Sequence, residues 1–150
     1  MEYKILNSND YIEIDELDKI RVNSFNQETG TDYFVNKIKN NQLSAVQVSV
    51  DNNVVGGAYV YISPNTYSLN IDRLFILEEY RHNNYASLLL EYILKNKKIF
   101  EDIYGIKVNK SIVEPSSDSL IEFYKLNGYK GPNVIGNMTK VIDYEDVKKI

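Results

Sequence analysis

The chain contains no cysteine among its 150 residues. This absence excludes a disulfide framework, a thiolate metal site and a cysteine nucleophile, and it fits the reducing cytoplasm, where we expect the protein to work. Histidine is nearly absent as well, since His82 is the only one. No serine motif accompanies it, so the sequence predicts neither a hydrolase triad nor a metal centre.

Long apolar runs are also missing. The longest, Val54 to Ile62, has nine residues, whereas about twenty are needed to cross a bilayer. The first ten residues have neither the basic start nor the apolar centre of a signal peptide. We therefore expect a soluble protein with no membrane partner, whose N-terminus is retained.

Positive charge is scarce. Seventeen basic residues face twenty-one acidic ones, for a net charge of -4, and the one basic cluster spans Lys95 to Lys98. Nucleic acid is therefore not an expected partner, and a cationic one is favoured. At this length, 43% hydrophobic residues allow one compact domain over residues 1–150.

Hydrophobic periodicity predicts alternating strands and helices. Asp10 and Glu13 have the spacing of a capping box at the start of a helix that reaches about Phe25. Alternating valines on both sides of Asp51 to Asn53 predict an antiparallel hairpin. The full expected order is strand 2–6, helix 10–25, helix 32–40, strand 46–50, strand 54–62, strand 66–77, helix 84–98, strand 106–114, helix 117–127 and strand 138–143.

This order predicts an α/β (α+β mixed) fold. Each amphipathic helix needs a sheet face to cover, so a mixed sheet with helices on both faces is the natural packing. The strands ending at Leu77 and Glu114 would form its parallel pair. For the glycines Gly56 and Gly57, we favour a bulge or close strand packing.

One segment, Leu74 to Ser87, predicts an anion site. Its strand-like half leads through a polar loop into residues with apolar side chains at helical spacing. The unpaired N–H groups of such a helix start attract anions, and Arg81 adds a positive charge, so a pyrophosphate would fit. An ordinary strand-loop-helix unit with a solvated Arg81 is the alternative.

The same segment contains Arg81-x-x-Asn84-x-Ala86, which resembles the pyrophosphate loop Gln/Arg-x-x-Gly-x-Gly/Ala of the GNAT superfamily of acyl-CoA-dependent N-acetyltransferases. Asn84 stands at the central glycine. Asparagine is the non-glycine residue that best tolerates a left-handed backbone. We therefore expect the loop shape to survive.

A second segment, Ser117 to Tyr129, resembles the family helix Asn-x-x-Ala-x-x-Leu-Tyr-Glu-Lys-x-Gly-Phe. Tyr124 matches its tyrosine, Gly128 the glycine that ends the helix in a left-handed cap, and Ser117 replaces its asparagine. Two motifs in the right order are more specific than either alone. The resemblance covers roughly residues 43 to 142.

The resemblance implies a mostly antiparallel, twisted sheet with a splayed central parallel pair, and acetyl-CoA as the acyl donor. The acetyl group would pass directly to a primary amine of a small molecule or peptide, whose identity the sequence does not give. The pantetheine arm would lie between the splayed strands and pair with the backbone of one of them. The residues expected to bind the donor are Leu74, Phe75, Ile76, Arg81, His82, Asn83, Asn84, Tyr85, Ala86, Ser87 and Ser117.

For catalysis, the resemblance assigns Tyr124 as the acid that protonates the departing sulfur, with a core tyrosine as the alternative. The backbone N–H of Ile76 would stabilise the oxyanion. Asp72 and Glu114 are the candidate bases. Alternation places Asp72 on the same side of its strand as Leu74, which is unexpected for a carboxylate unless a salt bridge or a bulge intervenes.

Two other classes of protein stay open. A non-catalytic sensor or partner module of the same fold would bind acyl-CoA without transfer, as the changes at Asn84 and Ser117 allow, although the retained Tyr124 favours an enzyme. A Rossmann-type nucleotide domain needs a glycine-rich turn after the first strand, which the chain lacks. The sequence leaves a homodimer open.

Overall fold

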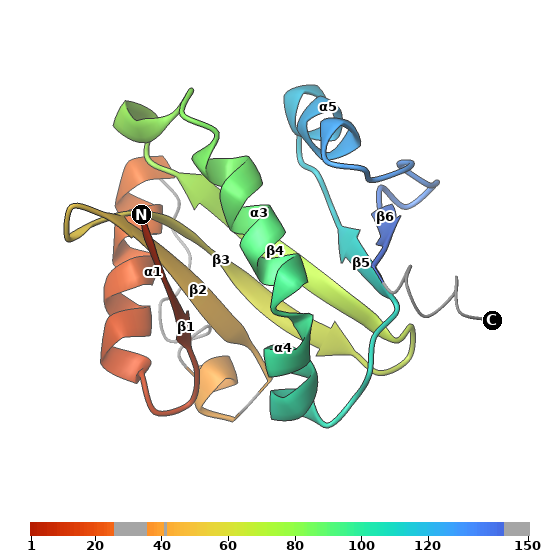
Figure 1. Ribbon diagram of the computed structural model, residues 1–150, viewed down its shortest axis with the longest axis horizontal. Helices are drawn as coiled ribbons and strands as arrows, with labels where there is room; N and C mark the ends of the chain where they lie inside the picture. The colour runs from red at the N-terminus through yellow and green to blue at the C-terminus, as the bar shows by residue number, and fades with distance from the viewer. Residues whose placement is uncertain (26–35, 41, 143–150) are drawn as a thin grey trace.

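The computed structural model describes residues 1–25, 36–40 and 42–142. Within these ranges the elements follow one another along the chain (Figure 1). They are β1 (Glu2–Leu6), α1 (Tyr11–Phe25), β2 (Ser44–Val50), β3 (Asn53–Ser63), β4 (Ser68–Ile76), the 3-10 turn η1 (Glu78–Tyr80), α3 (Tyr85–Lys95), α4 (Lys97–Tyr104), β5 (Lys110–Val113), α5 (Asp118–Leu126) and β6 (Met138–Val141). Residues 36–39 are also helical, and the rest of the predicted helix 32–40 lies outside the described residues.

The six strands form one sheet in the order β1-β2-β3-β4-β5-β6. Every pairing is antiparallel except that of β4 with β5. Helix α1 covers one face and α3 and α4 cover the other (Figure 1). This confirms the predicted fold class, a mostly antiparallel mixed sheet with helices on both faces and one central parallel pair.

Alternate residues of the strands build two cores. On β2, Val46 belongs to the cluster under α3 and α4, whereas Ala45 belongs to the cluster under α1. This follows from the two-residue period of a strand. The hairpin between β2 and β3 is also confirmed, because Asp51 and Asn52 have φ of 50° and 66°, as the two central residues of a type I′ turn require.

Three local predictions are wrong. The capping box does not form, since Asp10 Oδ2 accepts from the Asn7 N–H and the Glu13 carboxylate pairs with Lys4. The helix expected over 84–98 is two helices, because the N–H and the side-chain amide of Asn96 both donate to the Tyr92 carbonyl and close the first helix there.

The third concerns β5, which was expected over 106–114 and is shorter. Its lead-in residue Val108 binds side chains rather than a strand, donating its N–H to Glu101 Oε2 and accepting from Lys97 Nζ. The predicted helix 117–127 is confirmed in α5. It begins after Ser117 and is followed by Gly128 at a φ of 91°.

A bulge interrupts β4. Gly57 pairs with Phe75 and Tyr59 with Asp72, so Arg73 and Leu74 together lie opposite one β3 residue. Arg73 has a φ of 50°. The bulge shifts the alternation, so that Leu74 packs on the α3 side while Asp72 is paired with Tyr59 of the α1 side. The prediction that Asp72 and Leu74 share a face is therefore wrong.

The predicted reason for the two glycines is confirmed. A Cβ on Gly56 would overlap the Phe75 carbonyl oxygen, and one on Gly57 would lie 2.6 Å from the Val46 carbonyl oxygen. Only glycine allows β3 to approach its neighbours so closely beside the bulge.

Candidate functional site

The parallel pairing of β4 and β5 stops partway along β4. It runs from Ser68 opposite Lys110 to Ile71 opposite Val113, and β4 then continues to Ile76 without β5. We call this divergence the fork. Figure 1 shows β4 leading toward α3 and β5 toward α5. The splayed pair predicted from the sequence is therefore present, and beyond Ile71 the β4 edge opposite β3 has no strand beside it among the described residues.

Backbone groups of β4 alternate between β3 and the fork. The Leu77 N–H donates to the Val55 carbonyl at 2.8 Å, so Leu77 and Phe75 direct their N–H and C=O groups toward β3, and Ile76 directs its own toward the fork. The backbone of Phe75 therefore faces β3 and not the fork, and its predicted role in binding the cofactor stays a prediction. The backbone of Ile76 has the orientation that pairing with a cofactor requires. For Leu74, beside the bulge, the pairing stays a prediction.

The loop after β4 presents a run of free backbone donors. In the described part of the chain, no acceptor binds the backbone N–H groups of residues 82–87. His82 and Asn84 have φ of 68° and 61°, which confirms the left-handed Asn84. Its side chain does not cap α3. The positive end of the α3 dipole adds to these donors, so the loop suits an anion.

Arg81 holds this loop against the end of β4. Its Nε donates to the Ile76 carbonyl at 3.0 Å, which leaves the Ile76 N–H as the other backbone group directed to the fork. Asn83 Nδ2 donates to the Tyr80 carbonyl at 3.2 Å. The predicted anion-binding residues thus form a turn that side-chain hydrogen bonds hold in place, and their contact with a cofactor stays a prediction.

Two further predicted positions belong to the helices on either side of the fork. Ser87, in the first turn of α3, accepts a hydrogen bond from Asn127 Nδ2 at 3.3 Å, which joins it to the end of α5. Ser117 caps α5, since its Oγ accepts from the Leu120 N–H at 3.2 Å. Tyr85 and Ala86 are half-buried at the start of α3.

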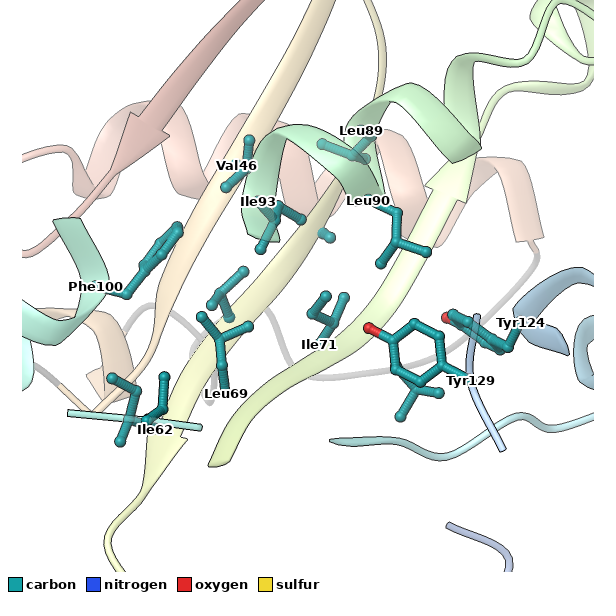
Figure 2. Close-up of a cluster of buried hydrophobic side chains, with 14 of the residues drawn as sticks. Val46, Ile62, Leu69, Ile71, Leu89, Leu90, Ile93, Phe100, Tyr124 and Tyr129 are labelled. Carbon is teal, nitrogen blue, oxygen red and sulfur yellow. The ribbon is translucent and has the colours of Figure 1, made fainter. Parts of the chain in front are cut away.

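Tyr124 combines a buried ring with a hydroxyl that forms no hydrogen bond to any described residue. The side chain is 6% exposed, and its ring packs edge-on against Phe123 and Tyr129. Figure 2 shows the two tyrosines side by side, with the Tyr124 hydroxyl directed away from α5. Burial, and then the charge of Asp72, raise the pKa of Tyr124 to about 12.

The neighbouring Tyr129 is a useful contrast. Its hydroxyl lies 2.7 Å from Ser111 Oγ, whereas no hydrogen bond is formed by the Tyr124 hydroxyl within the described residues. Only Asp18 Oδ2 there is a fully buried side-chain polar atom without a partner. The Tyr124 hydroxyl must therefore touch solvent. The ring of Tyr124 is part of the core, as the alternative prediction has it, while its hydroxyl stays accessible.

The two candidate bases stand at the fork. Asp72 and Glu114 each follow the last paired residue of their strand. Asp72 Oδ2 is 2.9 Å from Arg73 Nη1, and both side chains are partly exposed, so both the salt bridge and the bulge considered for Asp72 are present. Glu114 is exposed.

Tyr61 is a residue of this region that sequence reasoning missed. Burial raises the pKa of Tyr61, and the charges of Asp72 and Glu114 raise it further. The charge of Asp72 thus raises the pKa of both Tyr61, which packs on the α1 side of the sheet, and Tyr124, which packs on the α3 side. No sequence signal marks Tyr61, because only the strand register brings it to the fork.

A buried ionic network under β3 was also missed. Asp18 Oδ1 accepts from the Tyr59 hydroxyl at 2.6 Å and from Arg21 Nη2 at 2.8 Å, and burial raises the pKa of Tyr59. The signal was available, because Asp18 and Arg21 continue the apolar stripe of Ile14 and Leu17 on α1. Charged residues on a buried stripe need partners.

The described ranges contain neither a metal-binding cluster nor a membrane-spanning helix. No three histidine, cysteine or acidic residues gather there as a metal would require. Within those same residues, no helix has the length and apolarity to cross a membrane.

Comparison with known proteins places this geometry in a family. Residues 10–129 match the model of the acetyltransferase (GNAT) family. The chain therefore belongs to the GNAT acetyltransferases, whose acyl donor is acetyl-CoA. No curated protein sequence matches it significantly.

Solved structures share the fold at low identity. An aminoglycoside 6'-acetyltransferase type Ii is 19% identical, with a TM-score of 0.70 over 95% of this chain and 97% of that one. A ribosomal-protein-alanine N-acetyltransferase from Brucella melitensis biovar Abortus 2308 is 15% identical, with a TM-score of 0.64 over 89% and 95%. A predicted acetyltransferase from Clostridium acetobutylicum, solved with acetyl-CoA, is 19% identical, with a TM-score of 0.62 over 89% and 92%.

Proposed function

We propose that this protein is an N-acetyltransferase that passes the acetyl group of acetyl-CoA directly to a primary amine of a small molecule or peptide. Residues 1–150 would act as one domain, in the cytoplasm. The observation that carries the proposal is the fork, around which a loop of unpaired N–H groups and the unpartnered Tyr124 hydroxyl both lie. The 3.3 Å bond between Asn127 and Ser87 holds these two sides together.

The donor would bind through charge and backbone. The N–H groups of residues 82–87 would bind the pyrophosphate, because they have no acceptor among the described residues and lie at a helix start. The open β4 edge at Leu74 would bind the pantetheine arm as an added strand does, which leaves the Ile76 N–H for the oxyanion, since its carbonyl accepts from Arg81. These residues fit an extended, anionic acyl-CoA.

The transfer needs three groups from the protein. The amine nitrogen forms a bond to the thioester carbonyl, the carbon–sulfur bond breaks, the thiolate gains a proton and the ammonium loses two in all. The Ile76 N–H, directed to the fork, would stabilise the oxyanion. Tyr124 would donate to the sulfur, and a carboxylate, Asp72 or Glu114, would accept a proton from the amine.

The raised pKa of Tyr124, about 12, keeps its hydroxyl protonated at neutral pH, as an acid requires. Complete transfer of this proton to a thiolate, whose pKa is about 8.5, would be uphill by about 5 kcal/mol. Tyr124 would therefore donate a hydrogen bond to the departing sulfur, and one of the two protons that the ammonium loses would neutralise the thiolate, while the carboxylate accepts the other.

A sensor that binds acyl-CoA without transfer is the second candidate. The observation in its favour is Ser117, whose hydroxyl already caps α5. A sensor does not require an accessible tyrosine hydroxyl within a buried cluster, whereas an enzyme requires one to act on the departing sulfur, so we favour the enzyme.

An acceptor panel tests the proposal. Acetyl-CoA is incubated with amines of different classes, and released CoA is measured with a thiol reagent beside a control without acceptor. The chain has no cysteine, so the protein itself gives no thiol signal. Amine-dependent CoA release with a matching N-acetyl product is the expected result. Binding of acetyl-CoA with no release across the panel would favour the sensor.

A further inference from the structure

Asn127 caps the end of α5 with a side chain that forms two hydrogen bonds. Its Nδ2 donates to the Phe123 carbonyl at 2.9 Å, four residues earlier on the same helix, and to Ser87 Oγ at 3.3 Å. A carbonyl oxygen only accepts, so the atom beside Phe123 must be the amide nitrogen, which has two hydrogens to donate. The two acceptors together fix the orientation of the amide.

Asn96, at the end of α3, shows what the first of these bonds does alone. It is the C-terminal cap of that helix, and its Nδ2 donates to the Tyr92 carbonyl at 2.8 Å, also four residues earlier. Its side chain forms no other hydrogen bond to a described residue. One donor is therefore enough to close a helix in this chain, and the second bond of Asn127 has another role.

That second bond joins the two helices on either side of the fork. Ser87 belongs to the first turn of α3, which follows β4, and Asn127 ends α5, which follows β5. No other hydrogen bond links these two helices in the described part of the chain. Both side chains are half-buried, so water competes with their bond less than it would at the surface.

The same bond leaves Ser87 with a hydrogen to donate. Its Oγ must accept from Asn127, because an amide nitrogen does not accept. Its own hydroxyl hydrogen has no acceptor within the described residues. The hydroxyl belongs to the helix turn that carries the free N–H groups of residues 82–87. Asn127 thus makes the Ser87 hydroxyl an additional donor beside those of the loop.

Lys140 supports Asn127 from β6. Its Nζ donates to the backbone carbonyl of Asn127 at 2.8 Å and lies 6.0 Å from the centre of the Tyr129 ring. The same side chain lies against Gly128, where a Cβ would come within 3.2 Å of it. Hydrogen bonds therefore hold Asn127 to α5, α3 and β6 at once.

We propose that Asn127 is a positioning residue of the donor site, which directs the Ser87 hydroxyl to the phosphates of acetyl-CoA and holds α5 against the start of α3. The inference rests on the proposed function, because it takes the loop of residues 82–87 as the donor site. Asn127 acts through Ser87 and not by contact with the donor.

A double-mutant cycle on acetyl-CoA affinity, measured by titration calorimetry, tests this coupling. Ser87→Ala should raise the dissociation constant about tenfold, as the loss of one hydrogen bond to a charged group does, and Asn127→Ala should raise it a fewfold. The double variant should bind as Ser87→Ala does, because Asn127 has no other route to the donor. The same loss from Asn127→Ala in both backgrounds would overturn the inference.

Asn96→Ala is the matched control. It removes the same kind of cap, so both alanine variants should lower the Tm, but only Asn127→Ala should weaken acetyl-CoA binding. S-acetylpantetheine has the acyl arm without the phosphates and should bind equally to wild type and to Asn127→Ala. Equal losses of acetyl-CoA affinity in the two alanine variants, or a loss shared by both donors, would overturn the positioning role.

Asn127→Asp is a second variant that keeps the size of the side chain. A carboxylate cannot donate to Ser87, and it would accept the hydroxyl hydrogen that the phosphates need. Acetyl-CoA should therefore bind more weakly to Asn127→Asp than to Asn127→Ala. Wild-type affinity in Asn127→Asp would overturn the inference.

These measurements concern binding, so they separate the inference from the proposed function. Coupled binding of acetyl-CoA by Asn127 and Ser87, with no acetylation in the acceptor panel, would refute the enzyme and support the positioning role. Acetylation of amines, with additive effects in the cycle, would support the enzyme and overturn the positioning role.

Discussion

Arg81 Nε donates a hydrogen bond to the Ile76 carbonyl at 3.0 Å, which ties the loop after β4 to the end of that strand. One side chain thus positions both the loop donors and the backbone group directed to the fork.

Replacement of Arg81 by alanine should weaken acetyl-CoA binding by roughly tenfold or more, because a positive charge and a hydrogen bond are lost together. Lys98→Ala is the control, since Lys98 is an exposed cation on α4 away from the loop. Titration calorimetry with acetyl-CoA measures both. Equal dissociation constants for the two variants would show that Arg81 does not serve the donor site.

Asn84 has a φ of 61°, which makes it a direct test of the loop shape. Asn84→Gly should keep or improve acetyl-CoA affinity, because glycine adopts this conformation without strain. Asn84→Val should weaken it, since a β-branched side chain at positive φ costs of order 1–3 kcal/mol. Identical affinities for all three proteins would show that the left-handed turn is not required for binding.

Tyr124→Phe and Tyr129→Phe form a matched pair on neighbouring rings. Tyr124→Phe should retain acetyl-CoA binding and lower turnover by roughly 10² to 10³, the contribution of one hydrogen-bond donor to the charge that develops in the transition state. Tyr129→Phe breaks the bond to Ser111 and should cost about 1 kcal/mol of stability with little change in the rate per folded molecule. The reverse pattern would place the acid at Tyr129.

The buried tyrosines also predict how stability depends on pH. The pKa of Tyr124 rises from 10.0 to about 12 on folding, so above about pH 10 the unfolded chain releases a proton that the folded chain retains. The stability present below pH 10 should therefore fall between about pH 10 and 12, by about 3 kcal/mol for this group. Denaturant titrations of wild type and Tyr124→Phe measure its share, and parallel curves would contradict the shift.

Much of this architecture follows from local patterns in the sequence. The hairpin at Asp51 and Asn52, the left-handed Asn84 and the left-handed Gly128 after α5 are each determined by nearby residues, so the sequence predicts them. The parallel pair follows from the strand and helix order. The family pattern then identifies Tyr124 as the residue to examine.

What the sequence did not reveal depends on contacts between distant residues. The bulge at Arg73 reverses the alternation of β4, and it arises from the way Gly56 and Gly57 pack against neighbouring strands. Tyr61 reaches the fork only through strand register. The break between the two helices at Asn96 depends on one side-chain hydrogen bond to a backbone carbonyl. The hydrophobic pattern continues through Asn96, so it does not reveal the break.

Thermal unfolding with and without nucleotide cofactors tests the central claim most directly. Acetyl-CoA at about a hundred times its dissociation constant should add roughly 2.7 kcal/mol to the stability, whereas NAD and ATP should add little. Ala86→Glu should abolish the acetyl-CoA shift while the protein still folds, because a carboxylate would then stand among the loop donors. A melting curve that saturating acetyl-CoA leaves unmoved would contradict the account.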